Sequence, residues 1–250
     1  MTKLDSTGPQ LKIARANRHI RDLENIFEVF ISSNPYSVAF DKDPQNMNWV
    51  ISANFEERIP IETSAIIGDV IHNLRSSLDH LTALAIRIDG NEPGYRNSFP
   101  IYKDQSTFND GYAGKLAGAS PKFIDFVVGL NPHGQNPTNN IYPVGKLNNL
   151  DKHDTMIPTV GVFSVKNIKI SDSNMNIFTI GEVVTTGNGI MNIAQFGGVE
   201  KVEINDDSEV GMDVVFNDTP VLNGESIVSS LRDFSQRCSG IIDDACRIEY

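Results

Sequence analysis

Residues 66–86, IIGDVIHNLRSSLDHLTALAI, form the stretch that decides how this chain is expected to fold. At about 3.6 residues per turn, its apolar side chains fall on one stripe of a long amphipathic helix. The members of that stripe are Ile67, Ile71, Leu74, Leu78, Leu81 and Ala85. We therefore predict a helix over residues 61–88 with one face in a core. Thr63 is a candidate cap near its start, and the turn residues 89–91 end it.

The opposite face of this helix carries an unusual set of polar groups. On or beside it lie His72, Asn73, Arg75, Ser76, Asp79 and His80. A solvated face would more usually carry Lys and Glu, which favour helices. Imidazoles, a guanidinium and a carboxylate suit general acid–base chemistry or phosphate binding. The alternative is structural, because Arg75 and Asp79 are spaced i, i+4 and can form an ion pair that stabilises the helix.

The remaining segments predict an α+β fold. Alternating, turn-punctuated runs indicate strands at about 36–58 and an antiparallel meander over 156–222. Apolar periodicity indicates further helices over residues 9–33, 108–116, 121–129, 141–153 and 223–247. We expect a helical bundle over residues 1–155 that includes a small β-hairpin at 36–58. The antiparallel β meander is then inserted before the C-terminal helix, residues 223–250, which returns to the bundle.

Composition limits the classes of function. The chain has 250 residues, 40% of them hydrophobic, which is enough for a real core. A net charge of −11 argues against gripping nucleic acid with the whole surface, although it leaves room for a local basic patch. No apolar run approaches the roughly 18 residues of a membrane span, and the N-terminal residues do not have the charged-then-apolar pattern of a leader, so we expect a soluble protein that is not exported. Cys238 and Cys246 are eight residues apart on one predicted helix and cannot bond, which fits a reducing cytoplasm.

The familiar signatures of cofactor and metal enzymes are absent from the sequence. There is no GxxxxGK[ST] or GxGxxG loop, no HExxH, no GxSxG and no CxxC pair. We therefore expect no cofactor and no metal. A metal site built from His72, Asp79, His80 and His153 is the less favoured alternative, because it requires separate helices to converge.

A second polar cluster, Asp151-Lys152-His153, closes the predicted helix over residues 141–153. It combines a carboxylate, an ammonium and an imidazole, and on that ground Lys152 and His153 are candidates for the same site. The structural alternative is that cationic side chains near the end of a helix offset its exposed carbonyl groups.

The run Arg75-Ser76-Ser77-Leu78-Asp79-His80 resembles the motif of the HEPN superfamily, an Arg and a His separated by four residues on a long bundle helix. That superfamily includes metal-independent endoribonucleases of toxin–antitoxin and defence systems. The longer run GDVIHNLRSSLDHL, with LNNLDKHD, also resembles a widespread group of bacterial proteins to which we attach no activity. The resemblance implies RNA as a partner. It also implies a homodimer, because members of the superfamily commonly pair two such helices.

The chemistry that this resemblance implies starts with His80 as general base on an RNA 2′-OH, which attacks the adjacent phosphorus and leaves a 2′,3′-cyclic phosphate. Histidine suits this step because its ordinary pKa of about 6.5 is close to neutral pH. Arg75 would stabilise the growing charge. The expected catalytic residues are His72, Arg75, Asp79 and His80, and those expected to bind substrate are Asn73, Ser76, Lys152 and His153.

The competing hypothesis is a non-catalytic protein that binds or assembles with a partner protein. In this case Arg75 pairs with Asp79, and the imidazoles of His72 and His80 bond to groups on neighbouring helices. The two hypotheses differ in placement. Catalysis requires Arg75 and His80 to share an open groove, whereas a structural role expects them to be sealed and individually paired.

Overall fold

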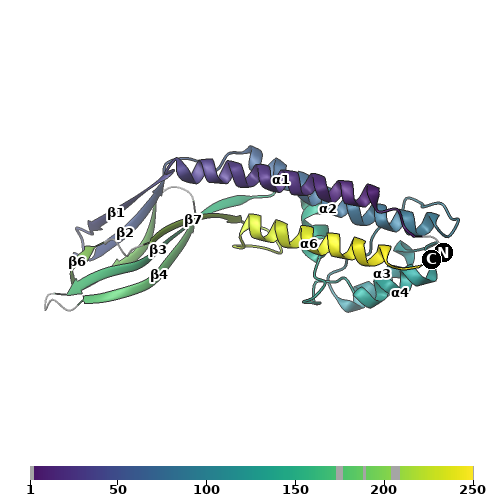
Figure 1. Cartoon of the computed structure of the whole chain (residues 1–250). Coiled ribbons are helices and arrows are strands. Elements are labelled where there is room, and N and C mark those ends of the chain that lie inside the picture. The colour runs from purple at the N-terminus through teal and green to yellow at the C-terminus, as the bar shows by residue number, and fades with distance from the viewer. Residues whose placement is uncertain (1–2, 173–176, 188–189, 204–208, 250) are drawn as a thin grey trace.

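The computed structural model describes residues 3–172, 177–187, 190–203 and 209–249. Its helices stand at one end of an elongated molecule and its strands at the other (Figure 1). The helices are α1 (Thr7–Ser32), α2 (Glu62–Arg87), α3 (Gln105–Lys115), α4 (Pro121–Leu130), α5 (Tyr142–His153) and α6 (Ile227–Cys246). The strands are β1 (Tyr36–Lys42), β2 (Trp49–Phe55), β3 (Thr159–Asp172), β4 (Ile177–Gly187), β5 (Ile190–Phe196), β6 (Val199–Glu203) and β7 (Glu209–Phe216). The predicted fold class, a helical bundle with antiparallel strands, is confirmed.

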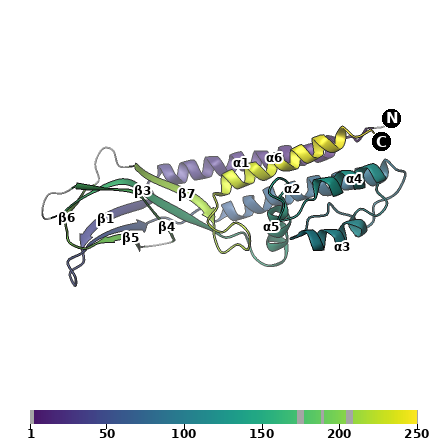
Figure 2. The ribbon, with the colours of Figure 1, turned by 90° about the horizontal axis from the view of Figure 1, so that it is seen from below.

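The helix α2 is the centre of the bundle. It packs against α1, α5 and α6, and the turned view shows α3, α4 and α5 gathered along its other side (Figure 2). The predicted apolar stripe is fully buried, since Ile67, Ile71, Leu74, Leu78, Leu81 and Ala85 are all 0% exposed. The core is completed by the apolar face of α6 and by the end of β7, where Phe216 is buried. Burial of this stripe against several helices positions the polar face of α2 beside α5.

The start of α2 differs from the prediction at one residue. The Thr63 hydroxyl does not cap the helix but donates to the carbonyl of Pro60 at 2.7 Å. The cap position is held by Ile61, whose side chain is 75% exposed and cannot accept a hydrogen bond. Thr63 is instead buried at 1% exposure, inside the helix. The other end follows the prediction, because Gly90 adopts a φ of +80° just beyond Arg87.

The strands form two antiparallel sheets, in the orders β1-β2-β5 and β4-β3-β6, with β7 also paired to β3. The pairing of β1 with β2 makes the hairpin, in which Tyr36 lies opposite Phe55. The strand β2 also pairs with β5, from Trp49 opposite Phe196 to Asn54 opposite Ile190. The hairpin therefore shares a sheet with the later β region, and the strand order departs from a simple meander. No helix in the described part of the chain is both long and apolar enough to cross a bilayer.

Candidate functional site: a cationic pocket beside helix α2

The polar face of α2 holds Arg75 in a fixed position. Arg75 donates from Nε to Asp79 Oδ2 at 3.1 Å and from Nη2 to Asp79 Oδ1 at 2.8 Å. Nη2 also donates to the carbonyl oxygen of Phe99 at 2.8 Å, and the backbone N–H of Phe99 donates back to Asp79 Oδ1 at 2.9 Å. The Arg75 side chain is only 14% exposed, so its charge lies largely below the surface. This closed network ties residues 98–102 to the helix.

Small residues on two neighbouring helices allow residues 98–102 to pack closely. The Phe99 ring is fully buried in the core and anchors this segment. A Cβ added at Gly111 of α3 would lie 2.1 Å from the Tyr102 hydroxyl oxygen, and one at Gly145 of α5 would lie 3.3 Å from Ile101 Cγ2. Glycine at these two positions therefore lets the segment sit between α3 and α5, opposite Arg75.

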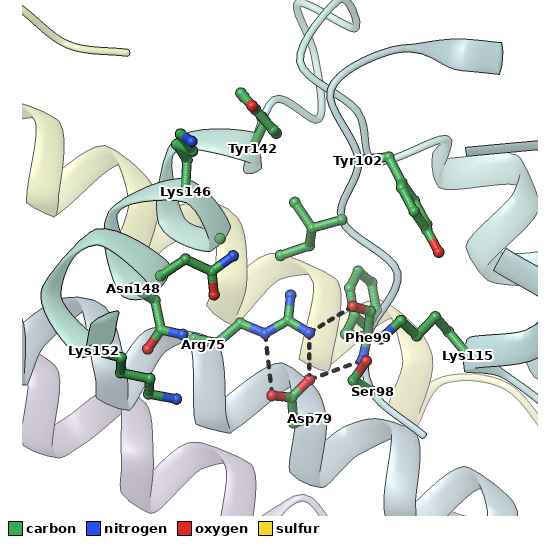
Figure 3. A pocket seen from close by; sticks show the side chains of 13 residues that line it. Arg75, Asp79, Ser98, Phe99, Tyr102, Lys115, Tyr142, Lys146, Asn148 and Lys152 are labelled. Atoms are coloured by element: carbon green, nitrogen blue, oxygen red, sulfur yellow. Dashed lines mark hydrogen bonds and ion pairs between the residues drawn. The ribbon is translucent and has the colours of Figure 1, made fainter. Parts of the chain in front are cut away.

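These elements enclose a pocket of about 530 Å³, which we call the cationic pocket. Its charged lining consists of Arg75, Lys115, Lys146 and Lys152 with a single carboxylate, Asp79. Its other walls include Ser98, Tyr102, Tyr142, Asn148 and Asn149. Figure 3 shows Lys146 and Lys152 reaching the pocket from α5, with Tyr102 and Lys115 on the opposite side. Since Asp79 is bound to Arg75, the three lysines leave the pocket positively charged within a protein of net charge −11.

One nitrogen of Arg75, Nη1, has no hydrogen-bond partner among the described residues. The guanidinium carries five N–H donors, and the network with Asp79 and Phe99 engages only Nε and Nη2. Figure 3 shows the remaining nitrogen, Nη1, directed away from Asp79 and toward the pocket. The Tyr102 phenol stands across from it. Burial raises the pKa of Tyr102, an effect that the positive charge of Arg75 opposes, so this phenol stays neutral and can donate a hydrogen bond.

Two polar atoms in the pocket wall have no hydrogen-bond partner among the described residues. They are Asn148 Oδ1 and Ser98 Oγ, both inaccessible to solvent. The Asn148 side chain belongs to α5 and the residue is 6% exposed. Buried polar atoms are nearly always paired in folded proteins. These two atoms therefore need a partner that the described residues do not supply, such as an ordered water or a ligand.

The structure brings together three of the residues predicted for the site, Arg75, Asp79 and Lys152. The other candidates do not line the cationic pocket. His72 is exposed, with Nε2 at 3.4 Å from Ser76 Oγ. The buried Asn73 donates from Nδ2 to the carbonyl of Asp69 at 2.7 Å. His153 is exposed in the last turn of α5 with Lys152, as the structural alternative expects.

His80 is not brought to Arg75. It is exposed beside the first turn of α1, where a Cβ added at Gly8 would lie 3.8 Å from its Nδ1. The helix explains this separation, because five residues advance about 500°, which places the two side chains roughly 140° apart around the axis. Asp79, four residues from Arg75, is only about 40° away and forms the ion pair. Within one copy of the chain, the two residues of the HEPN-like motif thus face different surroundings.

Asp151 belongs to the contact between α2 and α5 rather than to the cationic pocket. A Cβ added at Gly68 would lie 2.5 Å from Asp151 Oδ1, so glycine allows this carboxylate to rest on the α2 backbone. Burial raises the pKa of Asp151, and the nearby carboxylate of Asp69 raises it further, while His72 and Lys152 act in the opposite direction. The cluster Asp151-Lys152-His153 is therefore divided, and only Lys152 reaches the pocket.

The sequence prediction missed most of the pocket wall, but one part carried a signal. Five residues of α5 that line the pocket recur at three- and four-residue intervals, which places them on one face of the helix. They are Tyr142, Gly145, Lys146, Asn149 and Lys152. That face is the α5 wall of the pocket. Residues 98–102 and Lys115 had no such signal, because they reach the site only through tertiary packing.

Among the described residues, no group of three or more His, Cys, Asp or Glu side chains is placed to hold a metal ion. The chemistry offered by the cationic pocket is instead the binding of an anion by an oriented guanidinium, mobile ammonium groups and neutral hydroxyls. No protein-family model, curated protein or solved structure matches this chain.

Proposed function

We propose that this protein binds a phosphate-bearing ligand in the cationic pocket. The observation that carries the proposal is the position of Arg75. Its guanidinium is held by Asp79 and the Phe99 carbonyl, and its Nη1, which has no partner in the part of the chain that the structure describes, faces a pocket with three lysines. An arginine whose orientation is already fixed loses little conformational entropy when it binds a phosphate oxygen.

The dimensions of the pocket support a small ligand or one unit of a larger one. A volume of about 530 Å³ falls within the range of sites that enclose small molecules. Lysines bind phosphate as point charges, and arginine binds it through directed hydrogen bonds, so the two kinds of group complement each other here. The local positive charge also attracts an anion despite the acidic surface of the whole protein.

The proposal is tested by removing two lysines of α5 together. In an NMR titration, which detects millimolar affinity, the double variant Lys146→Gln/Lys152→Gln should bind inorganic phosphate about thirtyfold more weakly than the parent. Two charge-assisted contacts of roughly 1 kcal/mol each predict a loss of this size. The control is Lys3→Gln, which removes an exposed charge outside the pocket. An unchanged dissociation constant in the double variant would contradict the proposal.

A second candidate function, a metal-independent endoribonuclease of the HEPN type, is favoured by one observation. Arg75 opens onto a cationic pocket, as that chemistry requires of the residue that holds the phosphate. His80 lies elsewhere, so the general base at this phosphate would have to come from a second copy of the chain in a homodimer. Its exposure leaves it free to enter such a neighbouring site.

The ribonuclease candidate is tested on His80, because this exposed residue can be replaced without disturbing the network of Arg75. The parent should cleave single-stranded RNA to products with 2′,3′-cyclic phosphate ends, and His80→Ala should lose about a hundredfold or more in rate. His19→Ala is the matched control on α1. RNA that stays intact with the parent would leave phosphate binding without catalysis as the function, and equal cleavage by His80→Ala would refute His80 as the general base.

A further inference from the structure

We propose that the ligand of the cationic pocket carries a hydroxyl group next to its phosphate, and that Asn148 selects for it. The ligand class is a phosphate ester of a polyol or a sugar. This inference rests on the proposed function and adds what the phosphate is attached to. Its starting point is a mismatch between the pocket wall and a bare phosphate.

The mismatch lies in the kinds of hydrogen-bonding group that the pocket offers. Ionised phosphate oxygens accept hydrogen bonds, and Arg75, the lysines and the Ser98 hydroxyl can all donate to them. Asn148 Oδ1 is different, because a carbonyl oxygen can only accept. This oxygen is almost fully buried in the pocket wall and has no partner among the described residues. A ligand that satisfies it must therefore bring a donor of its own.

The positive charge of the pocket disfavours a charged donor on the ligand and favours a neutral one. An ammonium group on the ligand would enter among Arg75, Lys115, Lys146 and Lys152, and like charges repel at such short range. A neutral hydroxyl meets no such penalty. Because Asn148, Lys146 and Lys152 line the same pocket from α5, the donor to Asn148 Oδ1 and the phosphate held by those lysines share that pocket. A hydroxyl on a carbon near the ester oxygen meets this requirement.

The selection can be measured with two esters that differ only in their hydroxyls. Glycerol 3-phosphate and propyl phosphate have the same charge and a similar length. The parent should bind glycerol 3-phosphate about fivefold more tightly, the ratio expected for one neutral hydrogen bond to a buried acceptor. Asn148→Leu should bring this ratio to about one. Asn25→Leu, an exposed substitution on α1, should keep the parent ratio.

The two proposals fail in different ways. If propyl phosphate and glycerol 3-phosphate bind the parent equally well, the phosphate site stands and the selection by Asn148 is refuted. If neither ester binds, both proposals are refuted. The parent ratio alone gives this answer, whether or not Asn148→Leu folds. Substitution of an unpaired buried amide by an apolar side chain of similar volume is nevertheless expected to be tolerated.

A second pair of ligands distinguishes the source of the hydroxyl. A ribodinucleotide and its deoxyribose counterpart differ in the 2′-OH beside the linking phosphate. A ribose preference that Asn148→Leu abolishes supports a hydroxyl within RNA. A preference confined to glycerol 3-phosphate supports a free sugar or polyol phosphate. Equal binding of glycerol 3-phosphate and propyl phosphate would overturn the inference whatever the dinucleotides show.

Discussion

Removal of the charge on Asp79 should destabilise the helical bundle far more than removal of a similar charge elsewhere. Asp79 accepts hydrogen bonds from Arg75 at 2.8 and 3.1 Å and from the Phe99 backbone at 2.9 Å. Bonds to a charged group contribute roughly 1.5–3 kcal/mol each when buried. The Asp79 side chain is 34% exposed, so solvent screens part of this. We expect Asp79→Asn to lower the free energy of unfolding by about 2 kcal/mol.

The chain contains a close control in Asp233, which pairs with Arg237 of α6 at the same i, i+4 spacing and 2.7 Å. The side chains of Asp233 and Arg237 are 50% and 30% exposed. Arg237 donates to the carbonyl of Thr138 at 2.6 Å, but Asp233 accepts no distant backbone N–H among the described residues, unlike Asp79. Asp233→Asn should therefore cost about 0.5 kcal/mol or less. The difference between the two variants isolates the contribution of the link to Phe99.

Thermal unfolding followed by circular dichroism at a helix wavelength measures this difference. At roughly 2–4 °C per kcal/mol for a chain of this size, Asp79→Asn should lower the Tm by about 4–8 °C. Trp49 is the single tryptophan and lies in β2, so its fluorescence reports separately on the sheets. Equal Tm shifts for Asp79→Asn and Asp233→Asn would refute the argument that the network ties residues 98–102 to α2.

Three other substitutions or treatments test the packing around this region. Gly68→Ala should destabilise the protein by about 1 kcal/mol, because the new Cβ would collide with the Asp151 carboxylate. Gly240→Ala, whose Cβ would have nothing within 4 Å, should stabilise the protein by about 1 kcal/mol. Urea unfolding measures both changes, and equal effects would contradict the close approach of Asp151 to Gly68. Because burial raises the pKa of Asp151, the folded state binds the proton of this carboxyl more tightly than the unfolded state does. The contribution of Asp151 to stability therefore falls as the pH rises from about 3.8, its ordinary pKa, through its raised pKa in the folded state. Asp151→Asn should remove that decrease and exceed the parent in Tm at pH 7, and a lower Tm would contradict the sign. Burial also raises the pKa of Cys238 to about 12. A thiol reagent should therefore modify the half-buried Cys246 at least about tenfold faster than Cys238 in the folded protein. Mass spectrometry after timed labelling measures this ratio, and a ratio near one would contradict a closed core.

Local periodicity was enough to predict the helix α2 and the pair that it displays. The apolar stripe of α2 is buried as its spacing indicates, and the interval between Arg75 and Asp79 yields the ion pair. Both results depend only on the geometry of one helix. The same geometry also predicts that the side chains of His80 and Arg75 point in different directions, because an interval of five residues rotates a side chain by roughly 140° around the helix axis.

The rest of the site depends on contacts between distant parts of the chain. Lys115 and Ser98 reach the pocket because Phe99 is buried and because glycines at 111 and 145 leave room for the segment between them. The spacing of residues in the sequence does not predict such tertiary contacts. The sheet shows the same limit, since alternation of polar and apolar residues assigns faces to β2 and β5 but does not say that they are partners.

The late position of α6 along the chain has a consequence for synthesis on the ribosome. Its side chains Leu231, Phe234, Cys238 and Ile242 complete a core whose other walls come from α1, α2 and α5. About 70 residues separate α5 from α6, and at roughly 5–20 residues per second the ribosome needs several seconds to make them. During that interval the apolar surfaces of α1 and α2 that pack against α6 are uncovered, although α1 and α2 can already pack against each other. Truncated nascent chains that stop before α6 should consequently be bound by chaperones, and chains that include it should be released.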